Sequence, residues 1–240
     1  MTLVGAKDDA TGEVWALFAE AETGRVYFAL MREIFLSEGL PLALYSDRHT
    51  IFHSPREPTI IEQLNNSRPL TQFGRAMEEL GVSIIKAYSP QAKGRIERQW
   101  GIFQDRLVVE LRLASATTLA EANRVLKVFL RDYNSRFAVT AREGQKSWRT
   151  PPCAHPLDRI LCLKETRQVG NDHTISFDGL VLQLPAPKKF FSLAKKQVTV
   201  LVLRDGSMEI CYAGQTVGRY SQRRVLQLVE RYKRAKTRVA

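Results

Sequence analysis

Two carboxylates, Asp47 and Glu97, occupy positions where acidic side chains could hold divalent cations. Asp47 follows an apolar run, residues 41–45, which is short enough to predict a buried strand. Glu97 falls in the first turns of a predicted helix that follows a second strand, residues 82–87. Ligands gather at the carboxyl ends of the strands in parallel α/β sheets. Two carboxylates at one such edge could bind divalent metal ions, which would stabilise the attacking and leaving oxygens of a phosphoryl displacement.

The metal expected at this pair is Mg²⁺, or Mn²⁺ in its place. Hard cations of this kind prefer oxygen ligands, and Mg²⁺ keeps several waters, so few protein ligands suffice. The alternative is that Asp47 caps a turn and Glu97 is a solvated helix residue.

The surroundings of Glu97 favour the functional alternative. Gly94 lies three residues before Glu97 and Gly101 four residues after it, so one helix face beside the carboxylate lacks side chains. A glycine inside a helix costs about 1 kcal/mol, and two of them suggest close approach by a ligand backbone. Three basic residues surround the same turn and could contact phosphates, although an ordinary solvated face is the alternative: Lys93, Arg95 and Arg98.

The elements that must position these residues form an α/β pattern with parallel strands. Strands are predicted at residues 2–7, 13–19, 41–45 and 82–87, and helices at residues 24–38, 70–80, 89–112 and 118–133. A turn at residues 8–12 joins the first two strands into a hairpin. Residues 50–69 contain three prolines and little periodicity, which predicts a long loop.

The C-terminal part of the chain has a different composition. Residues 144–172 are interpreted as a linker, because Pro and Gly are frequent at their start. Five short strand-like runs with turn signals between them follow in residues 173–220 and predict a small all-β barrel, before a basic tail at 221–240. The strand-like runs are 174–177, 180–184, 197–203, 208–212 and 216–220.

Charge separates the same two parts. Residues 1–145 carry 18 Lys/Arg and 18 Asp/Glu, whereas residues 146–240 carry 18 Lys/Arg and seven Asp/Glu and hold the whole net charge of +11. Such a region could bind DNA phosphates with release of counterions, or it could simply be a soluble basic surface. The candidate DNA contacts in this region are Lys188, Lys189, Lys195 and Lys196.

Other classes of protein are disfavoured. The three cysteines form no CxxC pair, which disfavours a disulfide framework or a zinc knuckle. No apolar run reaches the roughly 18 residues that span a bilayer, and the first residues lack a signal-peptide layout. We therefore expect a cytoplasmic protein with no membrane partner.

Two stretches carry a family resemblance. The sequence LYSDR at 44–48, followed by YSPQAKGRIE at 88–97, resembles the core of the DDE-type integrase and insertion-sequence transposase superfamily. Residues 3–35 also resemble its second and third strands and first helix, so the similarity extends over about residues 3–150. It implies a ribonuclease-H-like core that cuts and joins DNA with the help of a metal, with Asp47 and Glu97 as its second and third catalytic carboxylates. The 50–69 segment then corresponds to an inserted loop.

The resemblance also implies partners and a second domain. The C-terminal strands resemble, more weakly, the small SH3-like barrel that binds DNA in relatives. Transposon ends and target DNA are the expected partners, with a homo-oligomer as the assembly and the bacterial cytoplasm or nucleoid as the location. The expected boundaries are 1–143 for the core, 144–172 for the linker, 173–220 for the barrel and 221–240 for the tail.

The chain departs from this family at one catalytic position. The first carboxylate of the family lies on a strand before the hairpin matched by residues 2–19. Asp8 and Asp9 are the only nearby acids that could serve as this metal ligand instead, but they fall in the hairpin turn. We therefore expect a core truncated at the N-terminus, lacking its first strand and first catalytic Asp, and poorly stable alone because backbone groups at the gap stay unpaired. The sequence leaves open whether this chain is catalytic. The alternatives to a strand-transferring transposase are a non-catalytic DNA-binding remnant and a nuclease that cuts DNA without joining it.

Overall fold

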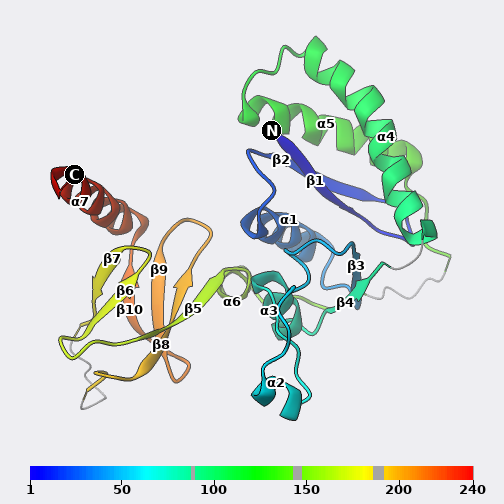
Figure 1. Ribbon diagram of the computed structural model, residues 1–240. Helices are drawn as coiled ribbons and strands as arrows, with labels where there is room; N and C mark the ends of the chain where they lie inside the picture. The colour runs from blue at the N-terminus through cyan, green and yellow to red at the C-terminus, as the bar shows by residue number, and fades with distance from the viewer. Residues whose placement is uncertain (88–89, 143–147, 186–191, 240) are drawn as a thin grey trace. The chain divides into compact units, whose positions relative to one another are not determined.

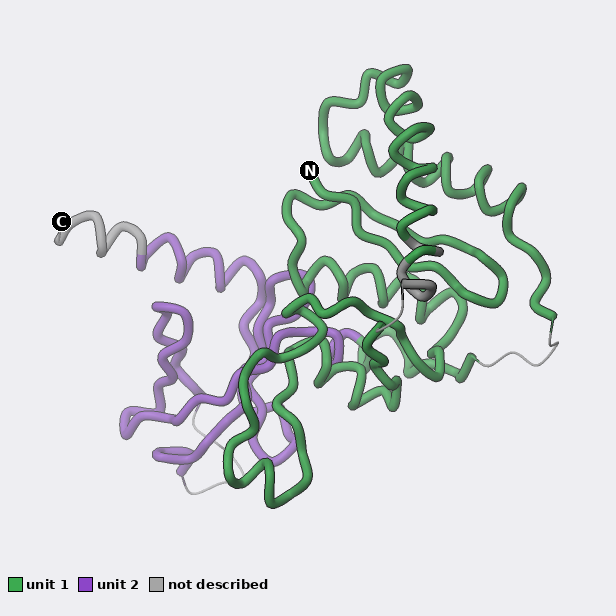
Figure 2. Tube along the Cα trace, turned by 45° about the vertical axis from the view of Figure 1, so that its right-hand side comes forward, with its two compact units in different colours: residues 1–157 green, residues 158–240 purple. Residues whose placement is uncertain are grey.

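The computed structural model describes residues 1–87, 90–142, 148–185 and 192–239, without the side chains of residues 90–93, 95, 96 and 233–239. The chain forms two compact units, unit 1 with residues 1–157 and unit 2 with residues 158–240, which Figure 2 colours separately. Unit 1 contains strands β1 (Thr2–Lys7), β2 (Val14–Ala19), β3 (Ala43–Ser46) and β4 (Ser83–Lys86), and helices α1 (Gly24–Ser37), α2 (Ile60–Leu64), α3 (Gln72–Glu79), α4 (Pro90–Leu113) and α5 (Leu119–Phe137). Helix α6 (Ala154–Ile160) follows along the chain.

Strands β1 and β2 form the predicted antiparallel hairpin, with Thr2 opposite Ala19 and Lys7 opposite Val14. Its turn is held by Asp8, whose carboxylate accepts the backbone N–H of Thr11 at 3.1 Å and its hydroxyl at 2.7 Å. The hairpin lies between α1 on one face and α4 and α5 on the other (Figure 1). Because side chains alternate along a strand, each face supplies apolar residues to a different helix layer.

Two asparagines of α5 bind the outer edge of β2. The side chain of Asn134 accepts the Val14 N–H at 3.0 Å and donates to the Val14 carbonyl at 2.9 Å. Asn123 makes the same pair of bonds to Phe18, at 2.8 and 3.0 Å. An amide side chain offers one donor and one acceptor, so it satisfies a strand residue as a neighbouring strand would. Helix α5 thereby closes one edge of the hairpin.

Strands β3 and β4 pair in parallel, with Ala43 opposite Ser83 and Ser46 opposite Lys86. The strand predicted at 41–45 is present as Ala43–Ser46, but the prediction that it is buried was wrong, because Tyr45 is 69% exposed. Within the described part of the chain this pair and the β1–β2 hairpin are separate two-stranded sheets with no shared strand. A two-stranded sheet covers less of each strand than a larger sheet does, which explains the exposure.

The segment predicted as a loop at 50–69 contains the five-residue helix α2. Thr59 and Glu62 form a capping box at its start: the Thr59 hydroxyl oxygen accepts the Glu62 N–H, and Glu62 accepts the Thr59 N–H at 2.7 Å. The apolar residues of α2 are exposed, so no periodic buried face marks it in the sequence.

Unit 2 is built from a four-stranded antiparallel sheet in the order β10-β9-β8-β5 and a separate hairpin, β6-β7. The strands are β5 (Leu163–Gln168), β6 (Thr174–Phe177), β7 (Leu180–Gln183), β8 (Gln197–Val202), β9 (Met208–Tyr212) and β10 (Gln215–Tyr220). The segment predicted as a linker, residues 144–172, contains regular secondary structure, because both α6 and β5 lie within it. Strand β5 is polar, which hid it in the sequence, yet it pairs with β8 along its whole length.

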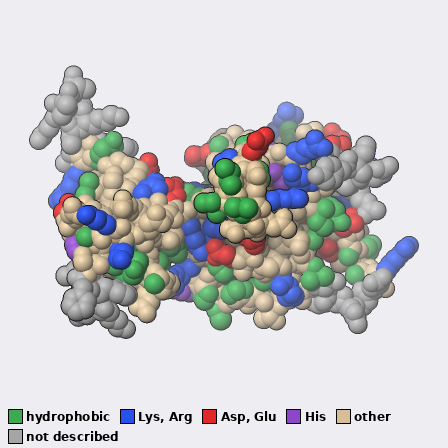
Figure 3. Space-filling model, turned by 60° about the horizontal axis from the view of Figure 1, so that its bottom comes forward, with side chains coloured by type: hydrophobic (Ala, Val, Ile, Leu, Met, Phe, Trp, Pro, Cys, Tyr) green, Lys and Arg blue, Asp and Glu red, His purple; other side chains and the backbone are tan. Residues whose placement is uncertain are grey.

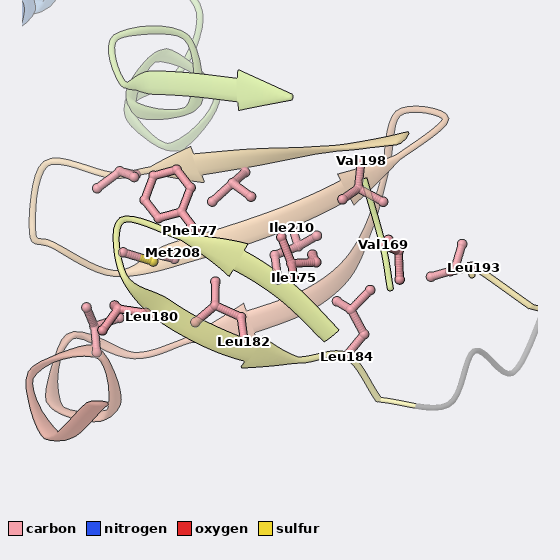
Figure 4. Packing of buried hydrophobic residues seen from close by; sticks show 13 residues of the cluster. Val169, Ile175, Phe177, Leu180, Leu182, Leu184, Leu193, Val198, Met208 and Ile210 are labelled. Atoms are coloured by element: carbon pink, nitrogen blue, oxygen red, sulfur yellow. The ribbon is translucent and has the colours of Figure 1, made fainter. Parts of the chain in front are cut away.

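The core of unit 2 is enclosed between the four-stranded sheet and the hairpin (Figure 4). Ile175 and Leu182 of the hairpin and Val200 and Ile210 of the sheet are fully buried there. The basic tail forms helix α7 (Gln222–Val239), which packs Val225, Leu228 and Val229 against this core. At the hairpin turn, Gly179 has φ of +75°, as the predicted Asp-Gly turn requires.

Candidate metal centre and nucleic-acid interface

Asp47 comes directly after β3, at the carboxyl end of the parallel β3–β4 pair. The backbone N–H of Ala87 donates to the Ser46 carbonyl at 2.8 Å, so the two strand ends lie side by side. The Asp47 side chain is exposed, and its Oδ1 accepts the backbone N–H of His49 at 3.0 Å. Asp47 therefore caps a local turn while its second oxygen has no hydrogen bond from the described residues.

A histidine borders this strand end. His53 Nε2 lies 2.9 Å from the Ser46 hydroxyl. Burial lowers the pKa of His53, the Lys86 ammonium lowers it further, and Asp47 opposes both effects. The ring and the Ser46 hydroxyl are within hydrogen-bond distance, so His53 contacts the residue next to Asp47.

Glu97 lies on α4, the helix that follows β4, about 10 Å along the axis from Pro90 at 1.5 Å per residue. Its side chain is exposed. A Cβ added at Gly94 or Gly101 would meet no described atom within 4 Å. Residues three and four apart share a helix face, so Glu97 stands between two open positions. No packing within the described chain explains either glycine.

The two predicted metal ligands thus follow neighbouring parallel strands, one directly and one through the start of a helix. Both are carboxylates that solvent can reach, which suits a hard cation that retains water. Among the described residues, no group of three or more His, Cys, Asp or Glu side chains is arranged to hold a metal ion. Asp8 is engaged by its own hairpin turn. The pair therefore provides oxygen ligands but does not form a larger protein cluster.

The predicted DNA contacts have mixed outcomes. Arg98 of α4 is exposed, and so are Lys195 and Lys196, which precede β8. The side chains of Lys93 and Arg95 and the whole of Lys188 and Lys189 lie outside the described residues. Lys and Arg side chains are spread over the face shown in Figure 3, with acidic side chains between them.

Unit 2 nevertheless has a strong positive charge. It contains 16 Lys/Arg and seven Asp/Glu, a net charge of +9. Helix α7 alone contains seven Lys/Arg and one Asp/Glu. Its apolar side packs on the core, and the described residues Arg223, Arg224 and Arg231 are exposed. The helix therefore places basic side chains outward.

One polar cluster was not found from the sequence. Gln99 of α4 is buried, with 2% exposure, and its Oε1 accepts hydrogen bonds from Lys7 Nζ and the Tyr133 hydroxyl, both at 3.1 Å. The three residues are distant along the chain and belong to β1, α4 and α5. No spacing rule joins them, so only the packing of these elements reveals the cluster.

Two known proteins are similar to this chain over most of its length. The protein y4bF of Sinorhizobium fredii, which its name proposes to be a transposase, is 32% identical over 212 residues, which cover 88% of this chain and 45% of that protein. The transposase for insertion sequence IS1202 of Streptococcus pneumoniae is 30% identical over 210 residues, which cover 85% of this chain and 43% of the relative. No protein-family model matches the chain.

The chain is therefore similar to transposases, and it spans less than half the length of each of these curated relatives. None of the helices in the part of the chain that the structure describes is long and apolar enough to cross a membrane.

Proposed function

We propose that this chain acts in DNA transposition, as a part of a transposase that cuts DNA and transfers its strands in a metal-dependent reaction. The observation that carries the proposal is the placement of Asp47 at the carboxyl end of β3, parallel to the strand that leads into the helix with Glu97. The similarity to transposases over more than four fifths of the chain supports the same activity.

In this proposal Asp47 and Glu97 hold Mg²⁺ or Mn²⁺. Their exposure leaves room for water and phosphate oxygens to complete the coordination, as Mg²⁺ sites commonly require. A cation held there would stabilise negative charge on a reacting phosphate and activate a water or a DNA hydroxyl as the nucleophile. The protein's own contribution is to place Asp47 at the carboxyl end of β3 and Glu97 on the helix that follows the neighbouring strand, and to keep Gly94 and Gly101 open for the DNA backbone.

We infer a ribonuclease-H-like integrase core for unit 1 and an SH3-like barrel for unit 2. A hairpin, a helix and a parallel strand pair in this chain order support the first assignment. The antiparallel strands around one apolar core support the second. Unit 2 would bind DNA through its net charge of +9, with Lys195, Lys196 and helix α7 as the contacts.

A metal-dependence assay on matched variants tests the catalytic part. Asp47→Asn and Glu97→Gln should each abolish nicking of supercoiled plasmid DNA in Mg²⁺, while binding of duplex DNA persists. Asp105→Asn and Glu110→Gln remove the same charges from exposed positions of α4 and should keep the activity. Metal-dependent nicking that survives Glu97→Gln would exclude Glu97 as a ligand.

A non-catalytic DNA-binding protein is the second candidate function. It is favoured by the lack of a group of three metal-ligand side chains among the described residues. It predicts salt-sensitive DNA binding by the wild-type chain with no nicking in Mg²⁺ or Mn²⁺, and equal binding by Asp47→Asn and Glu97→Gln. Nicking by the wild-type chain that both substitutions abolish would reject it.

A further inference from the structure

A small pocket opens in unit 1 where the end of β1 meets α4 and α5. It has a volume of about 160 Å³ and is lined by Lys7, Arg98, Gln99, Ile102 and Tyr133. Four of the five lining residues carry polar groups that can donate a hydrogen bond: Lys7, Arg98, Gln99 and Tyr133.

Gln99 organises the wall of this pocket. Its Oε1 is occupied by Lys7 Nζ and the Tyr133 hydroxyl, which fixes the amide orientation, since a reversed amide would point N–H groups at the Lys7 ammonium. Its Nε2 is buried and has no hydrogen-bond partner among the residues that the structure describes. Leaving a buried donor unpaired costs about 1–3 kcal/mol.

The charge of the pocket is uncompensated. Within the described residues, neither Lys7 nor Arg98 forms an ion pair with a carboxylate, and no acidic side chain lines the pocket. Lys7 uses one of its three N–H groups on Gln99 and has others available. Two cations that line one pocket without an acidic side chain match a group with several acceptor oxygens and negative charge.

We propose that this pocket binds a phosphate group, and that the phosphate is one of a DNA backbone. Lys7 is the anchoring cation, held in place by Gln99, and Arg98 contacts the same phosphate from the rim. This inference rests on the proposed function, because it names a contact to the DNA on which the chain would act. Charge-assisted hydrogen bonds from Lys and Arg to phosphate are the usual means by which proteins fix the register of a DNA strand.

The pocket is separate from the proposed metal centre. Glu97 and Gln99 are two residues apart on α4, which places them about 200° apart around the helix axis. Accordingly, Glu97 is exposed while Gln99 faces Lys7 and Tyr133 in the interior. The phosphate bound here is therefore a positioning contact and not the reacting group.

The experiment compares duplex DNA affinity and its salt dependence for Lys7→Gln and Lys127→Gln. Lys127 is an exposed residue of α5 outside the pocket, so both variants lose one positive charge from unit 1. Lys7→Gln should weaken binding by about tenfold, which corresponds to one charged hydrogen bond of roughly 1.4 kcal/mol. The slope of log K against log salt should fall by about 0.9. Lys127→Gln should leave both values almost unchanged, and equal effects of the two substitutions would overturn the proposal.

A titration with inorganic phosphate, followed by NMR of the Gln99 side-chain amide, tests the pocket without DNA. The wild-type amide resonances should shift and those of Lys7→Gln should not. A shift in the wild type together with unchanged DNA affinity of Lys7→Gln would assign the pocket to free phosphate and overturn the DNA assignment. If the wild-type chain binds no DNA at all, the proposed function fails. In that case the phosphate titration still decides whether the pocket binds an anion.

Gln99→Glu provides a second, nearly isosteric variant. A carboxylate at this position would pair with Lys7 and occupy the pocket with negative charge, so the Gln99→Glu chain should bind DNA at least as weakly as Lys7→Gln. Thermal unfolding of each variant is recorded beside its affinity. Undiminished DNA binding by a folded Gln99→Glu chain would overturn the proposal independently of Lys7.

Discussion

The indole of Trp100 on α4 lies against the backbone of Gly5 on β1. A Cβ placed on Gly5 would be 2.4 Å from Cη2 of Trp100 and 2.7 Å from the carbonyl oxygen of Trp15. Only glycine permits this approach, and the contact sets the distance between α4 and the hairpin. Because Glu97 lies three residues before Trp100 on the same helix, the contact also positions the proposed metal ligand.

Gly5→Ala should therefore destabilise unit 1 by about 1–3 kcal/mol, the usual cost of overpacking. The carbonyl of Trp15 belongs to the paired strand and cannot move away as the end of a flexible side chain would. Chemical denaturation of both forms measures the change. Gly24→Ala is the matched control, because a Cβ at Gly24 meets nothing within 4 Å. A loss of stability in the control of the same size would show that the contact with Trp100 is not the cause.

Replacing Gly94 or Gly101 of α4 by alanine should stabilise the fold, in contrast to Gly5→Ala. Gly94→Ala and Gly101→Ala should each raise the free energy of unfolding by about 0.5–1 kcal/mol, because alanine is the better helix former and a Cβ has free space. If these glycines admit a DNA backbone, the same variants should lose DNA affinity or nicking activity. Stability and DNA binding are measured on the same samples, and a gain in stability without any loss of DNA binding would show that neither glycine is kept for DNA.

The capping box of α5 makes a pH-dependent contribution to stability. The backbone N–H groups of Thr117 and Thr118 donate to the Glu121 carboxylate, both at 2.9 Å, and lower its pKa from 4.5 to about 2. A carboxylate with a depressed pKa stabilises the fold above its unfolded pKa, and this contribution is lost as the pH falls from 4.5 through about 2. NMR titration of Glu121 should give a midpoint near 2. The stability difference between wild type and Glu121→Gln should shrink over this range, and a constant difference would contradict the assignment.

A buried carboxylate holds the sheet of unit 2 together. Glu209 on β9 is almost fully buried and pairs with Arg159 Nε at 3.0 Å and with Arg219 Nε at 3.2 Å. Arg159 also lies 3.3 Å from the Thr216 hydroxyl, so it connects α6 to β10. Glu209→Ala should destabilise unit 2 by roughly 1–3 kcal/mol, because it leaves the partly buried Arg159 guanidinium without its carboxylate partner.

The two arginines allow an internal comparison. The side chain of Arg219 is 69% exposed and that of Arg159 is 31% exposed. Exposed ion pairs contribute only about 0–1 kcal/mol, so Arg219→Ala should have a small effect and Arg159→Ala a larger one. Urea denaturation of the three variants gives the order. A cost for Arg219→Ala as large as that for Arg159→Ala would show that burial does not decide the strength of these pairs.

Local signals in the sequence predicted most elements of the fold. The Asp-Gly pair at 178–179 predicted the β6–β7 turn, and the Thr118–Glu121 pair predicted the start of α5. These signals depend on neighbours within a few residues, so no tertiary information is needed to read them. The same reasoning missed α2 and β5, because their sequences lack the periodic apolar pattern that burial imposes on longer elements.

The candidate site was predictable in part. Asp47 and Glu97 were found because each lies near the end or the beginning of a predictable element, and Gly94 and Gly101 because their spacing matches a helix face. Whether they bind metal and DNA stays a prediction. The exposure of β3 was not predictable, since an apolar run reports the tendency of side chains to be buried and not the number of strands available to cover them.

What the sequence by itself determined is local: the turns, the helix starts, the order of strands and helices, and the separation of a neutral part from a basic part. These follow from backbone preferences and charges that act over a few residues. Only the tertiary structure decided that Lys7, Gln99 and Tyr133 share one pocket, that Trp100 rests on Gly5, and that Asn123 and Asn134 bind the edge of β2. These relationships join residues between 34 and 126 positions apart in the sequence. Their contacts form only when separate elements pack, and no pattern along the chain encodes the geometry of that packing.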